Sequence, residues 1–240
     1  MNKNKIDYSR YQNKFLNELN FSKEEISRYG ANSYPVYLRA PYEFFEFKVK
    51  SIVSNNTKIL DLCCGNGKHS ITAAKCGGKV LGLDIVESSI LIARQKAKLN
   101  NVEKNTHFQV VDINKLDFDD NSFDLVTCLG SLSYIDIDVF ISEVKRVLKE
   151  NGKLIIVDSL DNNFIYKFNR FLQVILNKRS YSTFNRMPNL NTINKIKSEF
   201  SNSEVRYFNL FAWTVPLLKL ILKPIQIKKI LNYLDNKFSY

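Results

Sequence analysis

The sequence predicts an α/β fold: a doubly wound, mostly parallel sheet with an N-terminal helical lid and C-terminal helical additions. From Lys58 to Val157, short apolar runs alternate with segments of helical spacing, which is the pattern of a parallel sheet with crossover helices. The apolar runs are too continuous for a sheet with one solvated face, so helices should cover both faces. The first run, which ends at Cys63, leads directly into a glycine-rich turn.

Residues 1–53 are predicted to form the helical lid. Aromatic side chains recur at helical spacing from Tyr8 to Phe15. Pro41 suits the first turn of a helix that would end near Val53, because the missing N–H of proline has no helical partner there anyway. This part is too small for a separate domain, so we expect it to lie over the main sheet.

Residues 54–163 are predicted to form the core of the molecule. The expected strands are 58–63, 79–83, 106–111, 123–129 and 153–157. The expected helices are about 68–75, 88–99 and 138–149. Gly77 with Gly78, and Gly152, are strong stop signals just past two of these helices.

Residues 164–240 are predicted to complete the sheet within a single overall domain. The expected elements are a helix beginning near residue 162, a helix from Thr192 to Phe200, a strand from Glu204 to Leu210, and a pair of short helices in Pro216–Leu234. Pro224 would separate the last two, because proline interrupts the hydrogen bonds of a helix interior.

The net positive charge of the chain lies almost entirely in this last part. The net charge is +11; residues 1–163 hold 22 basic and 21 acidic residues, whereas residues 164–240 hold 13 and 3. Such a basic part fits nucleic acid, an anionic membrane surface or a phosphorylated substrate, and is equally compatible with a solvated face.

Several features favour a cytoplasmic protein. There is no run of 18 apolar residues, and the residues from Met1 to Lys5 lack the apolar centre of a signal peptide. The chain has four cysteines without Cys-x-x-Cys spacing. Reduced structural thiols are therefore expected, rather than a zinc site or disulfides.

The glycine-rich turn predicts a ligand that lies against the backbone. Gly65 and Gly67 permit a close approach to main-chain N–H groups, and Asp84, nineteen residues after Gly65, is placed to bind a ribose diol. A dinucleotide fingerprint would have a glycine or an alanine at position 70, where this chain has Ser70. Asp61, inside the strand, would repel a pyrophosphate but suits a ligand with an ammonium group.

At these residues the chain resembles the class I S-adenosylmethionine-dependent methyltransferases, whose sheet is Rossmann-like. Their first motif reads here from Asp61 to Gly67, with Cys63 where the family usually has its first glycine. The likeness covers about residues 40–160. It includes Asp84, Asp112 and the segment that starts at Phe123, in the family's order.

The resemblance implies S-adenosylmethionine as cofactor and a role for each motif residue. Asp61 would contact the methionine end, Gly65 and Gly67 would admit the cofactor, and Asp84 would bind the ribose. The other expected cofactor-binding residues are Ile85 and Ile113 beside the adenine, Asp112 at its amino group, Leu129 beside the sulfonium, and Cys63, Tyr11 and Arg39 around the cofactor. A nicotinamide-dependent oxidoreductase is the weaker alternative, because Asp61 and Ser70 disfavour it.

Simpler structural roles are open for several of these residues. Asp84 and Asp112, each taken alone, are equally compatible with helix N-caps. Cys63 fits a small packing residue better than a nucleophile. His69 fits a helix start, and His107 fits the interior of a buried strand.

Tyr134, Asp158 and His69 are the candidates for catalysis, because they are expected near strand ends and a general base within hydrogen-bond reach activates a hydroxyl acceptor. Metal-assisted members of the family use an aspartate after the fourth strand and an Asp-Asn pair after the fifth. Asp161-Asn162 resembles the pair, but no carboxylate follows the fourth strand here. We therefore expect no metal.

The acceptor is expected to be a small anionic molecule, methylated most readily at oxygen. Motifs of base-modifying methyltransferases are absent after the fourth strand, so nucleic acid is not expected as partner. The segment from Val157 to Pro188 resembles methyltransferases of surface-polysaccharide gene clusters, which implies a sugar, a sugar nucleotide or a phosphorylated precursor as acceptor. The basic side chains that would hold a phosphate are Arg170, Lys178, Arg179 and Arg186.

Two alternatives remain for the acceptor and the partner. One is N-methylation of a small metabolite or an amino sugar. The other is a lipid-linked acceptor at a membrane surface, with weak contact through the basic C-terminal part and its tail, 216–234. The sequence does not indicate an oligomeric state.

Overall fold

The computed structural model describes residues 5–113, 116–161 and 164–238. The strands are β1 (Lys58–Leu62), β2 (Lys79–Asp84), β3 (Thr106–Val110), β4 (Phe123–Leu129) and β5 (Leu148–Val157). The helices of the core are α3 (Ala40–Ile52), α4 (Lys68–Lys75), α5 (Glu87–Leu99) and α6 (Ile137–Val147). The N-terminal helices are α1 (Lys5–Glu18) and α2 (Lys23–Ser27).

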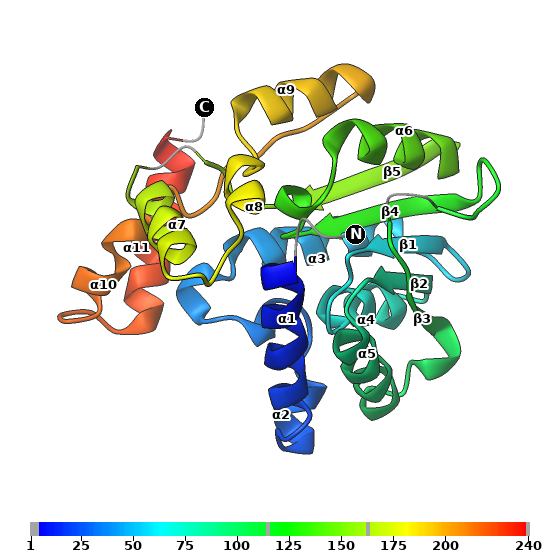
Figure 1. The fold of residues 1–240 in the computed structure, drawn as a ribbon, viewed down its shortest axis with the longest axis horizontal. Coiled ribbons are helices and arrows are strands. Elements are labelled where there is room, and N and C mark those ends of the chain that lie inside the picture. The colour runs from blue at the N-terminus through cyan, green and yellow to red at the C-terminus, as the bar shows by residue number, and fades with distance from the viewer. Residues whose placement is uncertain (1–4, 114–115, 162–163, 239–240) are drawn as a thin grey trace.

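The five strands form one sheet in the order β3-β2-β1-β4-β5, and each neighbouring pair is parallel (Figure 1). The predicted α/β class is therefore confirmed. The order reverses beside β1, so the loops after β1 and β4 leave the sheet side by side. In open parallel sheets, this switch point is where a crevice for a ligand forms.

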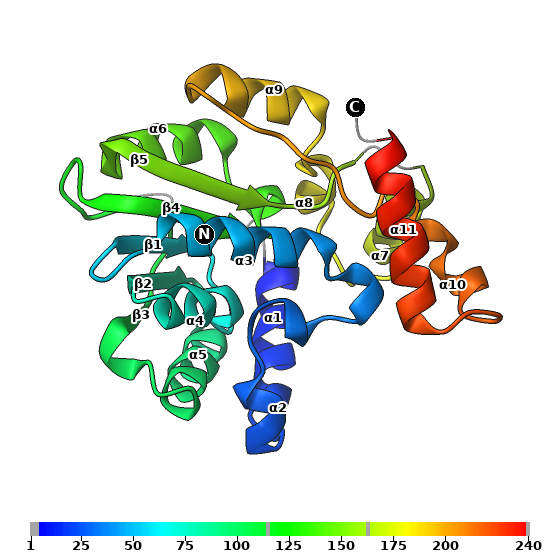
Figure 2. The same cartoon turned by 180° about the vertical axis from the view of Figure 1, so that it is seen from behind.

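Helices cover both faces of the sheet. Ile59 of β1 packs with Phe45 of α3 and with residues of α4 and α5, whereas Leu60 packs with Phe140 of α6. Successive strand residues point to opposite faces, so these two clusters lie on opposite sides of the sheet. In Figure 2, which is the view from behind, α3 lies over the face of the sheet nearer the viewer. This double cover explains the continuously apolar strands.

The start of β5 differs from the prediction. The strand was expected to begin at Lys153 after a helix reaching Lys149, but α6 ends at Val147 and Leu148 already pairs with Phe123. Burial accounts for the difference, because Leu148 is 6% exposed in the cluster that also holds Phe123. Gly152 consequently lies within the strand and is not a helix stop.

His107 was expected in the buried interior of a strand, and this prediction is wrong. It lies in β3, which is the edge strand of the sheet, and its side chain is exposed. Its Nε2 lies 3.0 Å from the side-chain nitrogen of Gln109.

The C-terminal part is helical in the region that the structure describes. Its helices are α7 (Phe164–Ile175), α8 (Tyr181–Asn185), α9 (Leu190–Glu199), α10 (Val215–Leu218) and α11 (Pro224–Phe238). Pro224 begins α11, which confirms its predicted role as a divider. The cap of α9 is Asn189, one turn before Thr192, and the Thr192 hydroxyl completes the capping box.

The predicted strand from Glu204 to Leu210 is wrong. The segment is irregular and runs over α3, where Phe208 packs on Phe44 with ring centroids 5.5 Å apart. Glu204 forms an ion pair with Lys48 of α3 at 2.6 Å. These contacts hold the chain on a helix instead of at the free edge of β5. Among the described residues, the sheet therefore stays five-stranded, and the predicted boundaries at residues 53 and 163 stay predictions.

None of the helices among residues 5–113, 116–161 and 164–238 is both long enough and apolar enough to cross a membrane.

Candidate functional site

The loop after β1 has an unusual backbone. Cys63, Gly65 and Gly67 have φ angles of 54°, 53° and 73°, in the left-handed region that glycine adopts without strain. A Cβ atom at Gly67 would lie 3.0 Å from the Cβ of Ala93 and 3.2 Å from Phe108. Gly67 is therefore required by space as well as by conformation. Cys63 adopts the same left-handed geometry although it has a Cβ atom.

Asp61 is a buried carboxylate beneath this loop, with 2% of its surface exposed. One oxygen accepts a hydrogen bond from the Thr127 hydroxyl at 2.7 Å, and the other accepts one from the Ser70 hydroxyl. Among the described residues, no cation forms an ion pair with it. Burial therefore raises the pKa of Asp61 to about 6, although both hydroxyls favour the ionised form.

Ser70 and Thr127 are site residues that sequence reasoning missed. Ser70 was noted only as a departure from a dinucleotide fingerprint, yet it is a partner of Asp61. Thr127 lies opposite Asp61 in the register of β4 against β1. The signal in the sequence that could have indicated this pair is a single polar residue inside each of two otherwise apolar predicted strands.

Asp84, at the end of β2, organises the loop after β1. Its carboxylate accepts hydrogen bonds from the N–H groups of Gly65 at 2.9 Å and Val86 at 2.8 Å. Burial raises the pKa of Asp84, and the two N–H groups oppose that shift. Asp84 is not the N-cap of α5, which is Val86. Its bond to Gly65 instead ties the loop after β2 to the loop after β1.

The remaining expected cofactor residues line the same edge of the sheet. Ile85 follows β2 and is 51% exposed, Asp112 follows β3 and is exposed, and Ile113 packs on the α6 side of the core. Leu129 ends β4. Beside it, Gly130 has a φ of 68°, and a Cβ atom there would meet nothing within 4 Å. The backbone is thus open to a ligand at Gly130.

These features fit S-adenosylmethionine. The glycine loop provides a close approach, the buried Asp61 suits an ammonium group, and open space at Gly130 suits a sulfonium carrying a transferable methyl. Asp84 and Asp112 stand at the ends of neighbouring strands, as the ribose and adenine ends of such a ligand require.

The helix α1 lies across this edge of the sheet (Figure 1). Glu18 accepts a hydrogen bond from the side chain of Asn66 at 2.7 Å, and a Cβ atom at Gly65 would lie 3.8 Å from Phe15. Gln12 accepts a hydrogen bond from the Ser88 hydroxyl of α5 at 3.1 Å. The predicted lid therefore contacts the loop after β1.

Two lid residues expected near the cofactor differ in their surroundings. The hydroxyl of Tyr11 lies 3.1 Å from that of Tyr134, so Tyr11 reaches the loop after β4. The guanidinium of Arg39, by contrast, donates to the carbonyl of Tyr34 at 2.8 Å and so stays within its own segment.

A cavity of about 280 Å³, here called the inner cavity, lies between the ends of β4 and β5, α1 and the C-terminal helices. Six of its lining residues carry the chemistry: Gly130, Tyr134, Asp158, Arg10, Arg170 and Arg179. Two predicted catalytic residues, Tyr134 and Asp158, thus meet three arginines from distant parts of the chain.

Asp158 anchors the floor of the inner cavity. Its oxygens accept hydrogen bonds from the N–H groups of Leu132 at 2.8 Å and Ser159 at 2.7 Å. Burial raises the pKa of Asp158, and these N–H groups act against the shift. A higher pKa makes a carboxylate a stronger base once it is ionised.

Tyr134 has a cationic neighbourhood. Arg10 donates to its hydroxyl at 3.0 Å, and the Arg179 guanidinium lies 5.6 Å from its ring centroid. The pKa of Tyr134 is raised, first by burial and then by the adjacent Tyr11 hydroxyl. Tyr134 is therefore a protonated phenol at neutral pH, which suits a hydrogen-bond donor better than a base.

Arg179 is a buried cation, with 6% of its surface exposed. It donates to the Ser133 hydroxyl at 3.0 Å, while its Nε has no hydrogen-bond partner among the described residues. Burying a charge without a partner is costly, so an anion in the inner cavity would relieve that cost.

His69 does not line the inner cavity. Its Nε2 lies 3.1 Å from the hydroxyl of Tyr34, and its ring stacks with Tyr42 at 5.3 Å between centroids. Burial lowers the pKa of His69 to about 3. A neutral, enclosed imidazole fits a packing role for His69 better than proton transfer.

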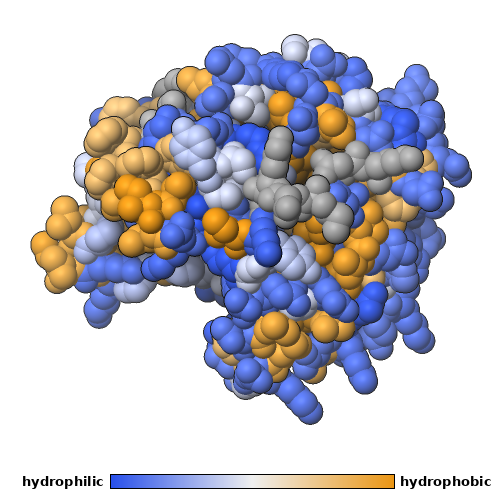
Figure 3. All heavy atoms as spheres, in the orientation of Figure 1, coloured by the Kyte–Doolittle hydropathy of each residue, from blue (hydrophilic) through white to orange (hydrophobic). Residues whose placement is uncertain are grey.

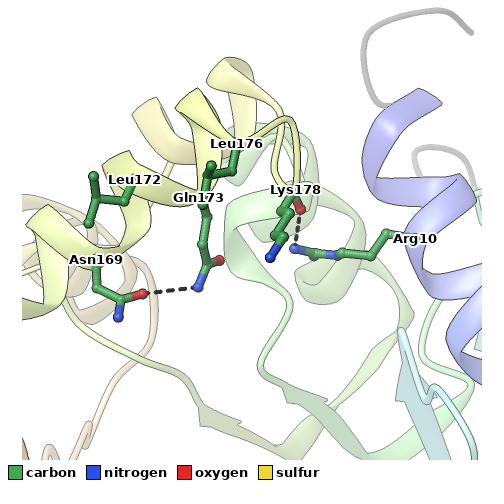
Figure 4. Close-up of a pocket in the computed structure, with 6 residues that line it drawn as sticks. All are labelled: Arg10, Asn169, Leu172, Gln173, Leu176 and Lys178. Carbon is green, nitrogen blue, oxygen red and sulfur yellow. Dashed lines mark hydrogen bonds between the residues drawn. The ribbon is translucent and has the colours of Figure 1, made fainter.

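A second cavity of about 450 Å³, the outer cavity, shares Arg10 with the inner one. Its other lining residues are Asn169, Leu172, Gln173, Leu176 and Lys178 (Figure 4). Arg10 reaches from α1 to the carbonyl of Lys178 at 2.8 Å. Arg186, a fourth basic residue expected at the acceptor, lines neither cavity.

The pair Asp161-Asn162 is described only in part. Asp161 forms an ion pair with Lys167 at 2.9 Å, whereas Asn162 lies outside the described residues.

The relatives in sequence carry the names of methyltransferases. A sterol 4-C-methyltransferase of Caenorhabditis elegans is 29% identical over 61% of this chain and 43% of its own length. A demethylmenaquinone methyltransferase of Lactobacillus johnsonii is 36% identical over 42% and 43%. A ubiquinone biosynthesis O-methyltransferase of Coxiella burnetii is 29% identical over 62% and 67%. The chain thus spans less than half the length of the first two relatives.

Solved structures share the fold. A putative methyltransferase of Bacillus halodurans has a TM-score of 0.53 and 26% identity, over 64% of this chain and 67% of its own. The geranyl diphosphate C-methyltransferase of Streptomyces coelicolor, in complex with Mg²⁺, geranyl diphosphate and S-adenosyl-L-homocysteine, has a TM-score of 0.61 and 14% identity, over 84% and 76%.

The family described as "Methyltransferase domain" matches residues 53–211, most of the chain, including every strand of the sheet. Together with the motif order and the fold, this match decides between the methyltransferase and the oxidoreductase interpretations. The chain belongs to the class I S-adenosylmethionine-dependent methyltransferases.

Proposed function

We propose that the protein transfers the methyl group of S-adenosylmethionine to an acceptor that carries an anionic group and sits in the inner cavity. The cofactor would lie along the carboxyl edge of the sheet, with its methionine end over Asp61 and its ribose at Asp84. The observation that carries the acceptor class is the inner cavity itself, where Arg10, Arg170 and Arg179 converge beside the open backbone of Gly130.

S-adenosylmethionine supplies an electrophilic methyl group when bound, so the chain has to orient the acceptor and exclude water. We assign the anion to the three arginines, because guanidinium groups bind carboxylate and phosphate oxygens in pairs. Tyr134 would donate a hydrogen bond to the acceptor. Asp158 would take the proton of an acceptor hydroxyl, which favours O-methylation over N-methylation.

The names of the relatives bear on the kind of acceptor. They mention a sterol, demethylmenaquinone and ubiquinone biosynthesis, and one structural neighbour binds geranyl diphosphate. None mentions a saccharide, so the acceptor of surface-polysaccharide type stays a prediction from the sequence. A lipid-linked anionic acceptor is the second candidate. It is favoured by the outer cavity, where Leu172 and Leu176 give an apolar path next to Arg10.

A kinetic comparison of two arginine variants tests the acceptor site. Production of S-adenosylhomocysteine would first be screened over phosphorylated sugars, sugar nucleotides and polyprenyl phosphates. With the acceptor so found, Arg170→Gln should raise KM by about tenfold or more through loss of a charge-assisted hydrogen bond, with affinity for S-adenosylhomocysteine unchanged. Arg186→Gln is the matched control, because Arg186 is basic and exposed and lines neither cavity.

Equal KM values for the two variants would contradict the assignment of the acceptor's anionic group to the inner cavity. Turnover only of uncharged acceptors would contradict the proposed acceptor class while leaving the cofactor assignment intact.

A further inference from the structure

The helix α7 is amphipathic with the wrong side outward for a soluble protein. None of its residues is buried. Phe164 is 82% exposed, and a continuous set of large apolar side chains shares that outer face: Phe164, Ile165, Phe168, Phe171, Leu172 and Ile175. On a helical projection with 100° per residue, these six positions fall on one side of the helix.

The opposite side of α7 is polar and faces the protein. Tyr166 donates to the Ser159 hydroxyl at 2.8 Å, next to Asp158, and the Arg170 guanidinium stacks on the Tyr166 ring at 4.7 Å. Arg170 also donates to Gln173 at 3.2 Å. An ordinary surface helix packs its apolar side inward. In α7 the polar side faces the inner cavity, so the apolar side faces solvent.

A second exposed apolar group lies in the turn between α10 and α11. Leu220 and Ile221 are 80% and 86% exposed, and Leu217 and Ile225 flank them. Both helices lie at the same end of the molecule as α7 (Figures 1 and 2). Figure 3 shows apolar atoms gathered at that end. We call the outer face of α7 together with the turn 217–225 the apolar end.

The two segments that form the apolar end, 164–175 and 217–225, carry only basic charged residues. Neither residues 162–198 nor residues 205–234 contain an aspartate or a glutamate. Lysines are interspersed with the apolar residues instead, as in Leu-Lys-Leu-Ile-Leu-Lys from Leu218 to Lys223. Exposed Phe, Leu and Ile with lysines and no carboxylates match a surface of acyl chains and anionic headgroups.

We propose that the apolar end docks the protein on an anionic lipid bilayer. At 12 residues, α7 is too short to cross a bilayer, so it would lie in the interface with its apolar side among the acyl chains. Lysines such as Lys219 and Lys223 would contact the headgroups. Exposed apolar side chains with lysines between them favour an anionic lipid surface over a protein partner.

Docking in this way brings the two cavities to the membrane. The helix α7 itself provides Arg170 to the inner cavity and Leu172, from the border of its outer face, to the outer cavity. The docking surface itself does not depend on the proposed function, so its test uses no methyl acceptor.

Co-sedimentation with vesicles tests the docking. The wild-type chain should pellet with vesicles of phosphatidylcholine plus phosphatidylglycerol, and much less with phosphatidylcholine alone. The double variant Phe164→Ser, Phe168→Ser should lower the partition coefficient by about tenfold or more, because two inserted aromatic side chains are lost. The control Phe21→Ser, Phe47→Ser alters two phenylalanines that are 49% and 64% exposed elsewhere. It should bind like the wild type.

Both double variants should keep the unfolding midpoint and the affinity for S-adenosylhomocysteine, which separates loss of docking from loss of fold. Equal pelleting of the two double variants, or no pelleting of the wild type with anionic vesicles, would overturn the proposal. So would a dimer in sedimentation velocity that the Phe164→Ser, Phe168→Ser variant abolishes, because a second copy would then cover the apolar end.

Discussion

Asp61 is the single residue that best distinguishes this site from a dinucleotide site. Its two hydroxyl partners, Thr127 and Ser70, hold the carboxylate in place but supply no positive charge. Keeping this buried carboxylate ionised at neutral pH costs free energy, and a cation bound beside it would offset that cost. The ammonium group of the cofactor is the cation that the proposed binding mode provides.

The raised pKa of Asp61 predicts a pH-dependent stability. Because the folded pKa of about 6 exceeds the unfolded value near 3.9, its contribution is fully present below pH 4 and is lost as the pH rises through 6. The neutral variant Asp61→Asn escapes that loss. Its free energy of unfolding relative to the wild type should therefore improve by about 2 kcal/mol between pH 4 and pH 7.

Urea unfolding at the two pH values measures this difference, and the titration of His69 cancels because both proteins contain it. A difference that does not change with pH would show that Asp61 has an ordinary pKa in the folded chain.

Cys63 shows at the same scale what a motif preserves. Its φ of 54° is strained for a residue with a Cβ, by about 1 kcal/mol. Burial raises the pKa of the Cys63 thiol, so it is a packing group rather than a nucleophile. The loop after β1 thus requires a left-handed residue at position 63, and the small side chain of Cys63 tolerates it.

At the scale of elements, α1 connects parts of the site that are far apart in the sequence. Asp7, buried on α1, accepts hydrogen bonds from the Thr183 hydroxyl at 2.8 Å and the Ser180 N–H at 3.2 Å, both of α8 and its cap. At its other end α1 holds Asn66 of the loop after β1 through Glu18. The helix therefore spans both the proposed cofactor and acceptor sites.

Removal of Asp7 should loosen this connection. Asp7→Ala removes two buried hydrogen bonds and leaves the Ser180 N–H without its acceptor. It should lower the free energy of unfolding by about 2 kcal/mol, since a buried group left unpaired costs about 1–3 kcal/mol. Urea unfolding measures the loss. Glu24→Gln, at an exposed carboxylate of α2, is the control and should stay within about 0.5 kcal/mol of the wild type. A similar small change for Asp7→Ala would contradict the role of α1 as a connector.

The elements also show where sequence reasoning succeeds. The bounds of α4 and β4 were predicted to the residue, because glycines and a polar turn bound strong apolar patterns there. The strand expected at Glu204–Leu210 failed because alternation is a local signal, whereas the choice between a sheet edge and the surface of α3 depends on distant contacts with Phe44 and Lys48.

At the scale of the whole molecule, the cofactor side was predictable and the acceptor side was not. The cofactor residues follow strand ends in a fixed order, so a parallel sheet brings them together. The inner cavity combines Arg10, Tyr134, Asp158, Arg170 and Arg179 from four separate segments. No spacing in the chain indicates that Arg10 of the lid would reach Tyr134.

The whole molecule has two parts that differ in how they expose apolar side chains. The sheet and its covering helices form an ordinary closed core, while α7 turns its apolar side outward at the apolar end. The two cavities lie between these two parts, as the proposed methyl transfer from a cofactor on the sheet to an acceptor on the other side requires.

The central claim is that the carboxyl edge of the sheet binds the cofactor, and calorimetry with S-adenosylhomocysteine tests it most directly. Asp84→Ala is the variant. Asp124→Ala is the control, because Asp124 likewise accepts a backbone N–H, from Lys58 at 2.8 Å, but at the opposite end of the sheet. We predict binding by the wild type and the control, and a loss of about tenfold or more for Asp84→Ala. Equal affinity of the two variants, or no binding by the wild type, would contradict the account.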